Sequence, residues 1–187
     1  QAEDGIRGFC LSRGLGDVYK RQIKLLATSR KVGDQYYAMV SPVMIDAKNP
    51  LYSVNGVFNA IFIHGNVLGD AMFYGSGAGK LPTASAVVAD VVDCAKNKGR
   101  NIMMSWSEEK LDLLQIDDVK SRFFVRVSGH AAERQSEIEE LFGKVEIVAV
   151  PSLSEEFAFI TGEITEQEYR EKAEKLDGIQ SRIRARI

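Results

Sequence analysis

The sequence predicts an α+β protein, in which a mixed sheet with one long helix is followed by a ferredoxin-like βαββαβ unit. Three observations support this fold class. Residues 23–74 hold one strand signal after another without an intervening helix, which favours an antiparallel or mixed sheet. A single strongly amphipathic helix follows Pro82. From residue 121 onward, strand and helix signals follow each other in the order βαββαβ.

The overall composition limits the classes of partner. With 187 residues, the chain forms one large domain or two small ones. Hydrophobic residues make up 45% and charged residues 27%, as in an ordinary soluble globular chain. The formal charge of −2 gives no electrostatic case for binding nucleic acid, and no apolar run approaches the ~20 residues of a membrane span. We therefore expect neither a nucleic-acid nor a membrane partner.

Cysteine and histidine are scarce. Cys10 and Cys94 are too few for a disulfide framework, which suits a reducing cytoplasm. His64 and His130 stand far apart in the sequence, so ordinary polar roles are favoured over metal ligation. The sequence therefore predicts no metal site.

Residues 1–22 match nothing that follows. They hold scattered glycines and charges, and they lack the continuous apolar core of a secretory signal. Their end, SRGLGDVYKRQ, resembles translated sequencing-adapter segments. We therefore expect the native sequence to begin near Ile23, with a native disordered tail as the alternative.

Four strands are expected before the helix. Residues 23–28 and 36–45 are rich in β-forming residues and are separated by a Gly-Asp step. Pro42 lies inside the second run, which predicts an edge position or a bulge. Residues 56–63 and 67–74 are joined by a His-Gly-Asn turn, which predicts a hairpin.

The helix after Pro82 carries one continuous apolar stripe. Its members are spaced at i, i+3, i+4, i+7, i+8 and i+11: Ala84, Val87, Val88, Val91, Val92 and Ala95. Valine is a modest helix former, so packing against a partner surface must supply much of the stability. The Asn-Lys-Gly sequence at 97–99 predicts the end of the helix.

A polar linker is expected over residues 101–120, and the βαββαβ unit over residues 121–187. Its second helix opens with a capping box, in which Thr165 is the N-cap and Glu168 the third helical residue. The last strand alternates apolar residues with glutamine and arginines. A solvated arginine face is favoured there, and an acidic partner is the alternative.

The glycine-rich turn at residues 75–79 is the main candidate site. It places the first N–H groups of a helix, and the positive end of its dipole, beside a loop with few side chains. Such a surface suits a phosphate or another anion, although simple turn chemistry is the alternative. A Walker A loop fails, because Tyr74 and Leu81 occupy two of its required positions. A dinucleotide fingerprint fails at Lys80, so only a contact to a cofactor held mainly elsewhere remains open.

Taken together, these stretches resemble homoserine dehydrogenase, in the family's order and spacing. The stretches are Ile23-Lys-Leu-Leu-Ala27, Ser41-Pro-Val43, Asn49-Pro-Leu51, Val57-Phe-Asn-Ala-Ile61 and Phe73-Tyr-Gly-Ser-Gly-Ala-Gly79, followed by Pro82-Thr-Ala-Ser-Ala-Val-Val-Ala-Asp90. Residues 122–187 resemble the ACT regulatory domain at the C-terminus of many bacterial members.

The resemblance implies a function. The family interconverts homoserine and aspartate semialdehyde with NAD or NADP, in threonine and methionine biosynthesis. Its members are usually dimers, built from a Rossmann domain and a substrate domain whose sheet forms the dimer contact. By this resemblance Gly75, Gly77, Ala78 and Gly79 contact the cofactor, and the helix after Pro82 packs on the nucleotide-binding domain. An amino-acid effector of the ACT domain and a homodimer or larger homo-oligomer are implied as partners.

Parts of the family pattern do not occur in the sequence. The dinucleotide fingerprint and the carboxylate motif that ends in the catalytic lysine, both upstream in the family, are absent. Lys24 and Lys80 match no catalytic position, so no catalytic residue is assigned. We therefore expect a C-terminal fragment without activity of its own, divided into residues 23–100 and 121–187.

The ACT-like region also departs from its family. Residues 128–133, Ser-Gly-His-Ala-Ala-Glu, stand where many ACT domains carry Asp-x-Pro-Gly at their amino-acid site. This difference argues against threonine feedback, whereas a dimerising role remains compatible. The alternative function is a non-catalytic, amino-acid-sensing or dimerising ACT module. The preference between NAD and NADP cannot be read from this sequence.

Overall fold

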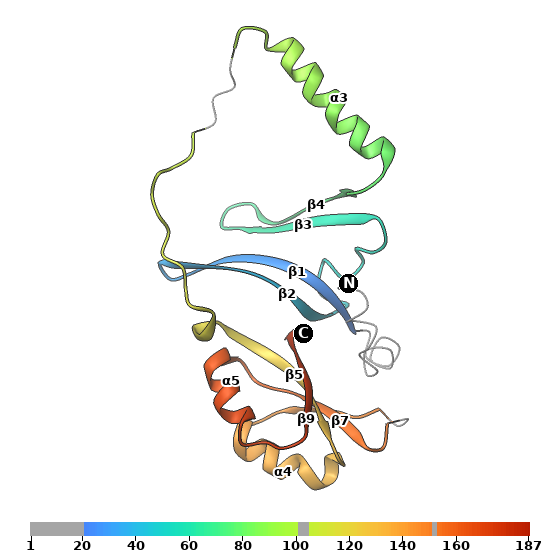
Figure 1. Ribbon diagram of the computed structural model, residues 1–187, viewed down its shortest axis with the longest axis vertical. Helices are drawn as coiled ribbons and strands as arrows, with labels where there is room; N and C mark the ends of the chain where they lie inside the picture. Colours follow the sequence, from blue (N-terminus) through green and yellow to red (C-terminus); the bar gives the residue numbers. More distant parts are fainter. Residues whose placement is uncertain (1–20, 101–104, 151–152) are drawn as a thin grey trace. The chain divides into compact units, whose positions relative to one another are not determined.

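The computed structural model describes residues 21–100, 105–150 and 153–187 (Figure 1). They fall into two compact units. One holds the described residues up to Asn49 together with Leu111–Ile187, and the other is Pro50–Lys110. The segment expected to be non-native lies outside the described residues, except for Arg21 and Gln22, which open the first strand.

The first unit is built on one mixed sheet, in the order β1-β2-β9-β5-β7-β6, with β8 paired to β5. Its elements are β1 (Arg21–Val32), β2 (Gln35–Asp46), the 3-10 turn η1 (Ile116–Asp118), β5 (Lys120–Ser128), α4 (Ala131–Phe142), β6 (Glu146–Val148), β7 (Glu156–Ile160), β8 (Ile164–Thr165), α5 (Glu166–Ala173) and β9 (Ile179–Arg186). The predicted βαββαβ order is observed, with every neighbouring pair in β9-β5-β7-β6 antiparallel. Only β8 was not predicted, because two residues carry no readable alternation.

The first hairpin of the chain belongs to the same sheet as the βαββαβ unit. β1 and β2 pair antiparallel along their whole length, and residues Val43–Ile45 of β2 pair in parallel with Arg184–Arg186 of β9. Pro42 faces Leu25 of β1, and the pairing with β9 begins only at the next residue. This agrees with the expected edge position of the proline, which has no N–H to offer a second neighbour. The compact units therefore divide the chain differently from the predicted domains, whose boundaries remain a prediction.

Both faces of this sheet are buried around β5. Along β5, Phe123, Val125 and Val127 join the helix-side core with α4 and α5, while Phe124 joins a second core on the opposite face. The second core consists of Met44, Phe124, Val148, Val150, Ala158, Ile160, Ile183 and Ala185. Arg21 of β1 pairs with Glu146 of β6 at 2.6 Å, although these strands end the sheet order at opposite sides. The sheet therefore curls over its second core.

The arginine face of β9 is solvated only in part: Arg182 is 41% exposed and Arg186 donates to Thr28 at the surface, whereas Arg184 is 19% exposed. Arg182 and Arg184 both bind Glu166, whose side chain is only 5% exposed. The Arg182 guanidinium also lies over the rings of Tyr169 and Phe123, at 4.8 and 5.3 Å from their centroids. The acidic partner of this face is thus a residue of the same chain, brought there by the helix.

The second unit contains the hairpin of β3 (Phe58–Gly65) and β4 (Gly69–Ser76), followed by α3 (Lys80–Lys96). The predicted hairpin is confirmed, but its turn lies two residues later than the expected His-Gly-Asn step. His64 and Gly65 belong to β3, and the turn closes at Gly69, whose φ is 75°. The helix begins two residues before Pro82, which then stands in the first turn where no N–H donor is needed. No residue of α3 is buried, so its valine stripe has no cover within the described chain.

No helix of the described segments is long and apolar enough to span a bilayer.

Candidate functional site

The glycine loop connects the end of β4 to the start of α3. β4 ends at Ser76, and Gly77, Ala78 and Gly79 form an exposed turn before Lys80 opens the helix. The Gly77 N–H donates to the Val57 carbonyl at 3.1 Å, which extends the hairpin ladder into the loop. The hairpin that carries the loop is stabilised by the stacked rings of Phe58 and Tyr74, whose centroids are 4.9 Å apart.

The three glycines of the loop meet different surroundings. A Cβ at Gly75 would touch nothing within 4 Å. A Cβ at Gly77 would lie 1.6 Å from Nδ2 of Asn59, so the Asn59 side chain fills that space. Gly79 has φ 129° and ψ 153°, a backbone region that is essentially restricted to glycine.

The start of α3 is open to a ligand from solvent. Its N-cap is Gly79, which has no side chain to bond the first N–H groups, and its first turn holds no acidic residue. The first bond of the helix runs from the Thr83 N–H to the Gly79 carbonyl, so the N–H groups of Lys80 and Leu81 precede the helical ladder. These donors, the helix dipole and the Lys80 side chain all favour negative charge here.

The structure places the four predicted cofactor-binding residues next to one another, with Gly75 at the exposed end of β4 and Gly77, Ala78 and Gly79 in the exposed turn that follows. Their role in binding stays a prediction. Sequence reasoning did not single out Asn59, the residue that lies against the loop. Its only signal was a polar side chain within the apolar run of β3.

The loop between β5 and α4, the expected effector position, is held by the chain's own polar groups. Arg134 donates to the carbonyls of Ser128 and Asp177, both at 3.0 Å. The Ser128 hydroxyl donates to the Gly178 carbonyl and accepts from the Gln180 amide at 2.7 Å. These bonds join the loop to the turn before β9.

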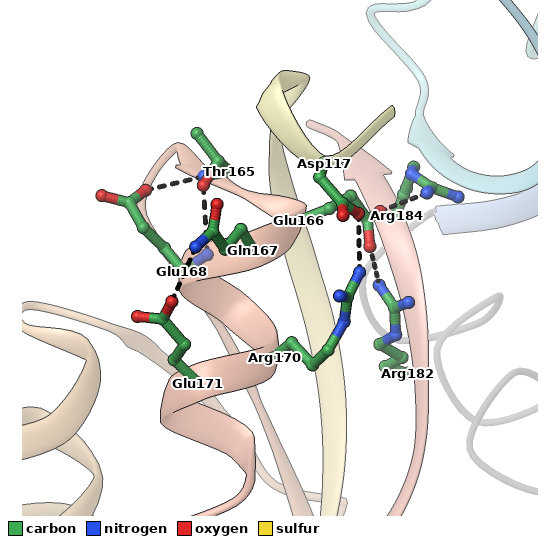
Figure 2. Close-up of polar contacts among 9 residues, drawn as sticks. All are labelled: Asp117, Thr165, Glu166, Gln167, Glu168, Arg170, Glu171, Arg182 and Arg184. Carbon is green, nitrogen blue, oxygen red and sulfur yellow. Dashed lines mark hydrogen bonds and ion pairs between the residues drawn. The ribbon is translucent and has the colours of Figure 1, made fainter. Parts of the chain in front are cut away.

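A second polar cluster joins α5 to β9 and η1 (Figure 2). Glu166, at the start of α5, accepts from Arg182 at 2.8 Å and also from Arg184. At the surface, Arg170 donates to Asp117 of η1 at 2.6 Å. This bond, together with the charge of Asp117, raises the pKa of Arg170 above its usual value.

Two further groups near α5 have shifted pKa values. Burial raises the pKa of Tyr169 to about 12, against an opposing effect of Arg182. The Thr165 N–H donates to the Glu168 carboxylate at 2.8 Å and lowers the pKa of Glu168. The Tyr169 shift reflects burial and the Glu168 shift reflects its capping hydrogen bond, so neither indicates an acid–base role.

Metal-ligating side chains do not gather in the described segments, where no group of three is found. His64 lies 2.5 Å from Asp70 across the exposed end of the β3–β4 hairpin, and His130 is the N-cap of α4. Cys94 is exposed on α3, and Cys10 lies outside the described residues.

The sequence profile of the homoserine dehydrogenase family matches residues 17–92, which include the whole glycine loop. Among curated relatives, the homoserine dehydrogenase of Lactococcus lactis is 39% identical over 108 residues, covering 56% of this chain and 25% of that protein. That of Corynebacterium glutamicum is 48% identical over 81 residues, covering 41% and 18%. The resemblance inferred from the residue pattern is thereby confirmed, and these relatives are oxidoreductases.

Solved homoserine dehydrogenase structures have a similar fold. The homoserine dehydrogenase of S. aureus at pH 6.0 superimposes with a TM-score of 0.70 at 26% identity, over 97% of this chain and 46% of that one. The enzyme of Thiobacillus denitrificans shares the fold, with a TM-score of 0.72 at 24% identity, over 98% and 45%. The chain thus spans about a quarter of the curated relatives' length and less than half of the solved ones.

Proposed function

We propose that this chain, similar to homoserine dehydrogenases over residues 17–92, is part of an NAD(P)-dependent homoserine dehydrogenase. The reaction is the interconversion of L-homoserine and L-aspartate 4-semialdehyde. One observation carries the proposal: the exposed glycine loop at the open start of α3 lies inside the matched segment.

The residues of the loop fit a closing contact to a dinucleotide. Gly75 and Gly77 present no side chain that would keep a ligand away, and the first N–H groups of α3 can donate to an anionic oxygen. The nicotinamide cofactor, when bound, supplies the hydride chemistry. No residue of this chain matches the family's catalytic lysine. The role left to the chain would be to orient and shield the bound cofactor.

The exposed stripe of α3 suits the same role. Val87, Val88 and Val91 are each about 60% exposed, although a valine-rich helix depends on packing for its stability. We infer that the nucleotide-binding domain of the complete enzyme covers this stripe. In the isolated chain the stripe stays exposed. The sheet of the β3–β4 hairpin would then contribute to the homodimer contact.

A titration of the ¹⁵N-labelled chain with NADPH, carried into the millimolar range, tests the cofactor contact, since a loop that only closes over a cofactor held mainly elsewhere should bind NADPH weakly. The amide signals of Gly75, Gly77 and Gly79 should shift, while those of Gly143 and Gly178 in the other unit serve as controls and should not. Equal shifts at both sets, or none at the loop, would contradict the proposal.

A steady-state assay tests the inferred division of labour. The purified chain should form no NADPH from homoserine and NADP, because the fingerprint and the lysine motif are absent from its sequence. Homoserine-dependent NADPH formation by this chain would refute that inference.

The unit at residues 121–187 is proposed to be an ACT-like regulatory domain without a threonine site at the β5–α4 loop. Arg134 and Gln180 already satisfy the polar atoms of Ser128. Calorimetry of the whole chain with threonine should give no saturable heat. Saturable binding would contradict the absence of a threonine site. A non-catalytic, amino-acid-sensing or dimerising ACT module remains the alternative function.

A further inference from the structure

Asn59 of β3 lies directly against the glycine loop. A Cβ built on Gly77 would lie 1.6 Å from its Nδ2, 2.5 Å from its Cγ and 3.2 Å from its Cβ. All three distances are below normal van der Waals contact, so the carboxamide of Asn59 occupies the place of a side chain at residue 77. Within the second unit, no other glycine has a contact shorter than 3.0 Å.

Space, and not backbone conformation, distinguishes residue 77, because a side chain there would have to displace the exposed carboxamide of Asn59. Gly77 is not among the glycines with positive φ, so an alanine could adopt its backbone angles. The residue opposite Asn59 in the hairpin is Gly75, yet a Cβ there would meet nothing within 4 Å. The Asn59 side chain therefore leans along the strand toward Gly77 and away from its direct partner.

The side chain also lies where the loop is anchored to the hairpin. The Gly77 N–H donates to the Val57 carbonyl, and the Asn59 side chain lies where a Cβ of residue 77 would be. Val57 and Asn59 therefore contact Gly77 on two sides. The next residues, Ala78 and Gly79, lead directly into the first turn of α3. A displacement at Gly77 would thus move the N–H groups that start the helix.

We propose that Asn59 is a positioning residue for the glycine loop, paired with Gly77 and acting through it on the ligand-binding turn. The proposal rests on the proposed function, because it takes the loop to be the cofactor contact. Asn59 fixes the path of Gly77–Gly79, and Gly77 is glycine so that Asn59 can stand there.

A double-mutant cycle tests the pairing. Gly77→Ala should displace the Asn59 carboxamide, shift the amide signals of the loop and lower the hydrogen-exchange protection of residue 77. In the Asn59→Ala background, or in Asn59→Gly where even the 3.2 Å contact is removed, Gly77→Ala should have little further effect. Gly65→Ala, whose Cβ would meet only ordinary contacts of 3.7 Å or more, is the control and should leave the signals of residues 77–79 unchanged in either background. An effect of Gly77→Ala that is equal in all backgrounds would overturn the proposal.

Titration with NADPH separates positioning from mere support. Asn59→Ala should weaken the NADPH-induced shifts of Gly75 and Gly79 several-fold while the melting temperature stays near that of the wild type. Asn59→Asp, which keeps the shape of the side chain, should keep the loop signals of the ligand-free wild type. Unchanged NADPH shifts in Asn59→Ala would refute the role of Asn59. If NADPH moves no loop signal even in the wild type, the proposed function fails, and the cycle above still decides the Asn59–Gly77 pairing.

Discussion

The three loop glycines show how one residue type can serve three physical needs. Gly75 has free space and an ordinary backbone, Gly77 leaves room for Asn59, and Gly79 adopts a backbone that other residues avoid. The sequence showed only the spacing of the glycines. Their separate reasons depend on a neighbouring strand and on dihedral angles, which no spacing encodes.

Alanine should therefore change the free energy of unfolding by different amounts at the two ends of the loop. Gly79→Ala forces a side chain into a glycine-only backbone region and should cost about 1–3 kcal/mol of the free energy of unfolding. Gly75→Ala, its control, should be close to neutral. Urea unfolding of both variants measures the difference, and equal losses would contradict this assignment.

Glu166 is the most deeply buried acidic group of the described residues. Glu166→Gln removes the buried counter-charge of the partly exposed Arg182 and Arg184 guanidinium groups and should destabilise the first unit by about 1–3 kcal/mol. Asp117→Asn breaks the exposed pair with Arg170 and should have no measurable effect. Urea denaturation monitored by circular dichroism compares the two, and a similar loss in both would contradict the difference in burial.

Tyr169 should make stability depend on alkaline pH. Its pKa is raised to about 12 in the folded chain, above the ordinary value of 10.0, because burial disfavours the phenolate. Between these values the unfolded chain loses the proton first, so the free energy of unfolding falls as pH rises, by at most about 1.4 kcal/mol per pH unit. Below pH 10 this contribution of Tyr169 to stability is fully retained. Tyr169→Phe should remove this part of the decline in denaturation curves from pH 9 to 12, and an identical slope in both proteins would contradict the assignment.

At the scale of elements, α5 is the helix whose start was read best from sequence. Thr165 and Glu168 exchange the two bonds of a capping box, as their spacing predicted. The reason is that both bonds join residues three apart, so no distant neighbour is needed to form them.

Removal of the cap should weaken α5. Thr165→Ala should cost about 1 kcal/mol of unfolding free energy, because the N–H of the third helical residue loses its acceptor. Thr165→Ser keeps the hydroxyl and should restore most of this loss in thermal unfolding. Similar melting temperatures for the alanine and serine variants would contradict a capping role.

The opposite case is α3. Its apolar stripe and its end near residues 97–99 follow from periodicity and are observed, but the stripe is exposed. Periodicity tells which face of a helix seeks cover, and it does not tell what covers it. The same limit applied to β9, where two of the arginines expected to be solvated bind Glu166 of α5.

At the scale of the whole molecule, β2 joins the start of the chain to its end. Met44 is 1% exposed and lies in the core formed with Phe124 and Ile183. Met44→Ala should therefore destabilise the βαββαβ unit by about 2–5 kcal/mol, although it lies more than seventy residues before β5 in the printed sequence. Hydrogen exchange of β5 and β9 amides measures this coupling. Exchange that is unchanged there would show that β2 contributes nothing to that core.

The sequence by itself determined the order and type of the elements, the β3–β4 hairpin, the capping box and the likeness to homoserine dehydrogenase, since these depend on neighbouring residues or on short motifs. The tertiary structure alone decided that β2 pairs with β9, that Glu166 meets the arginines of β9, and that Asn59 fills the space above Gly77. Each of these joins residues that are distant along the chain. Such contacts arise from strand pairing and burial summed over a whole unit, which no local pattern specifies.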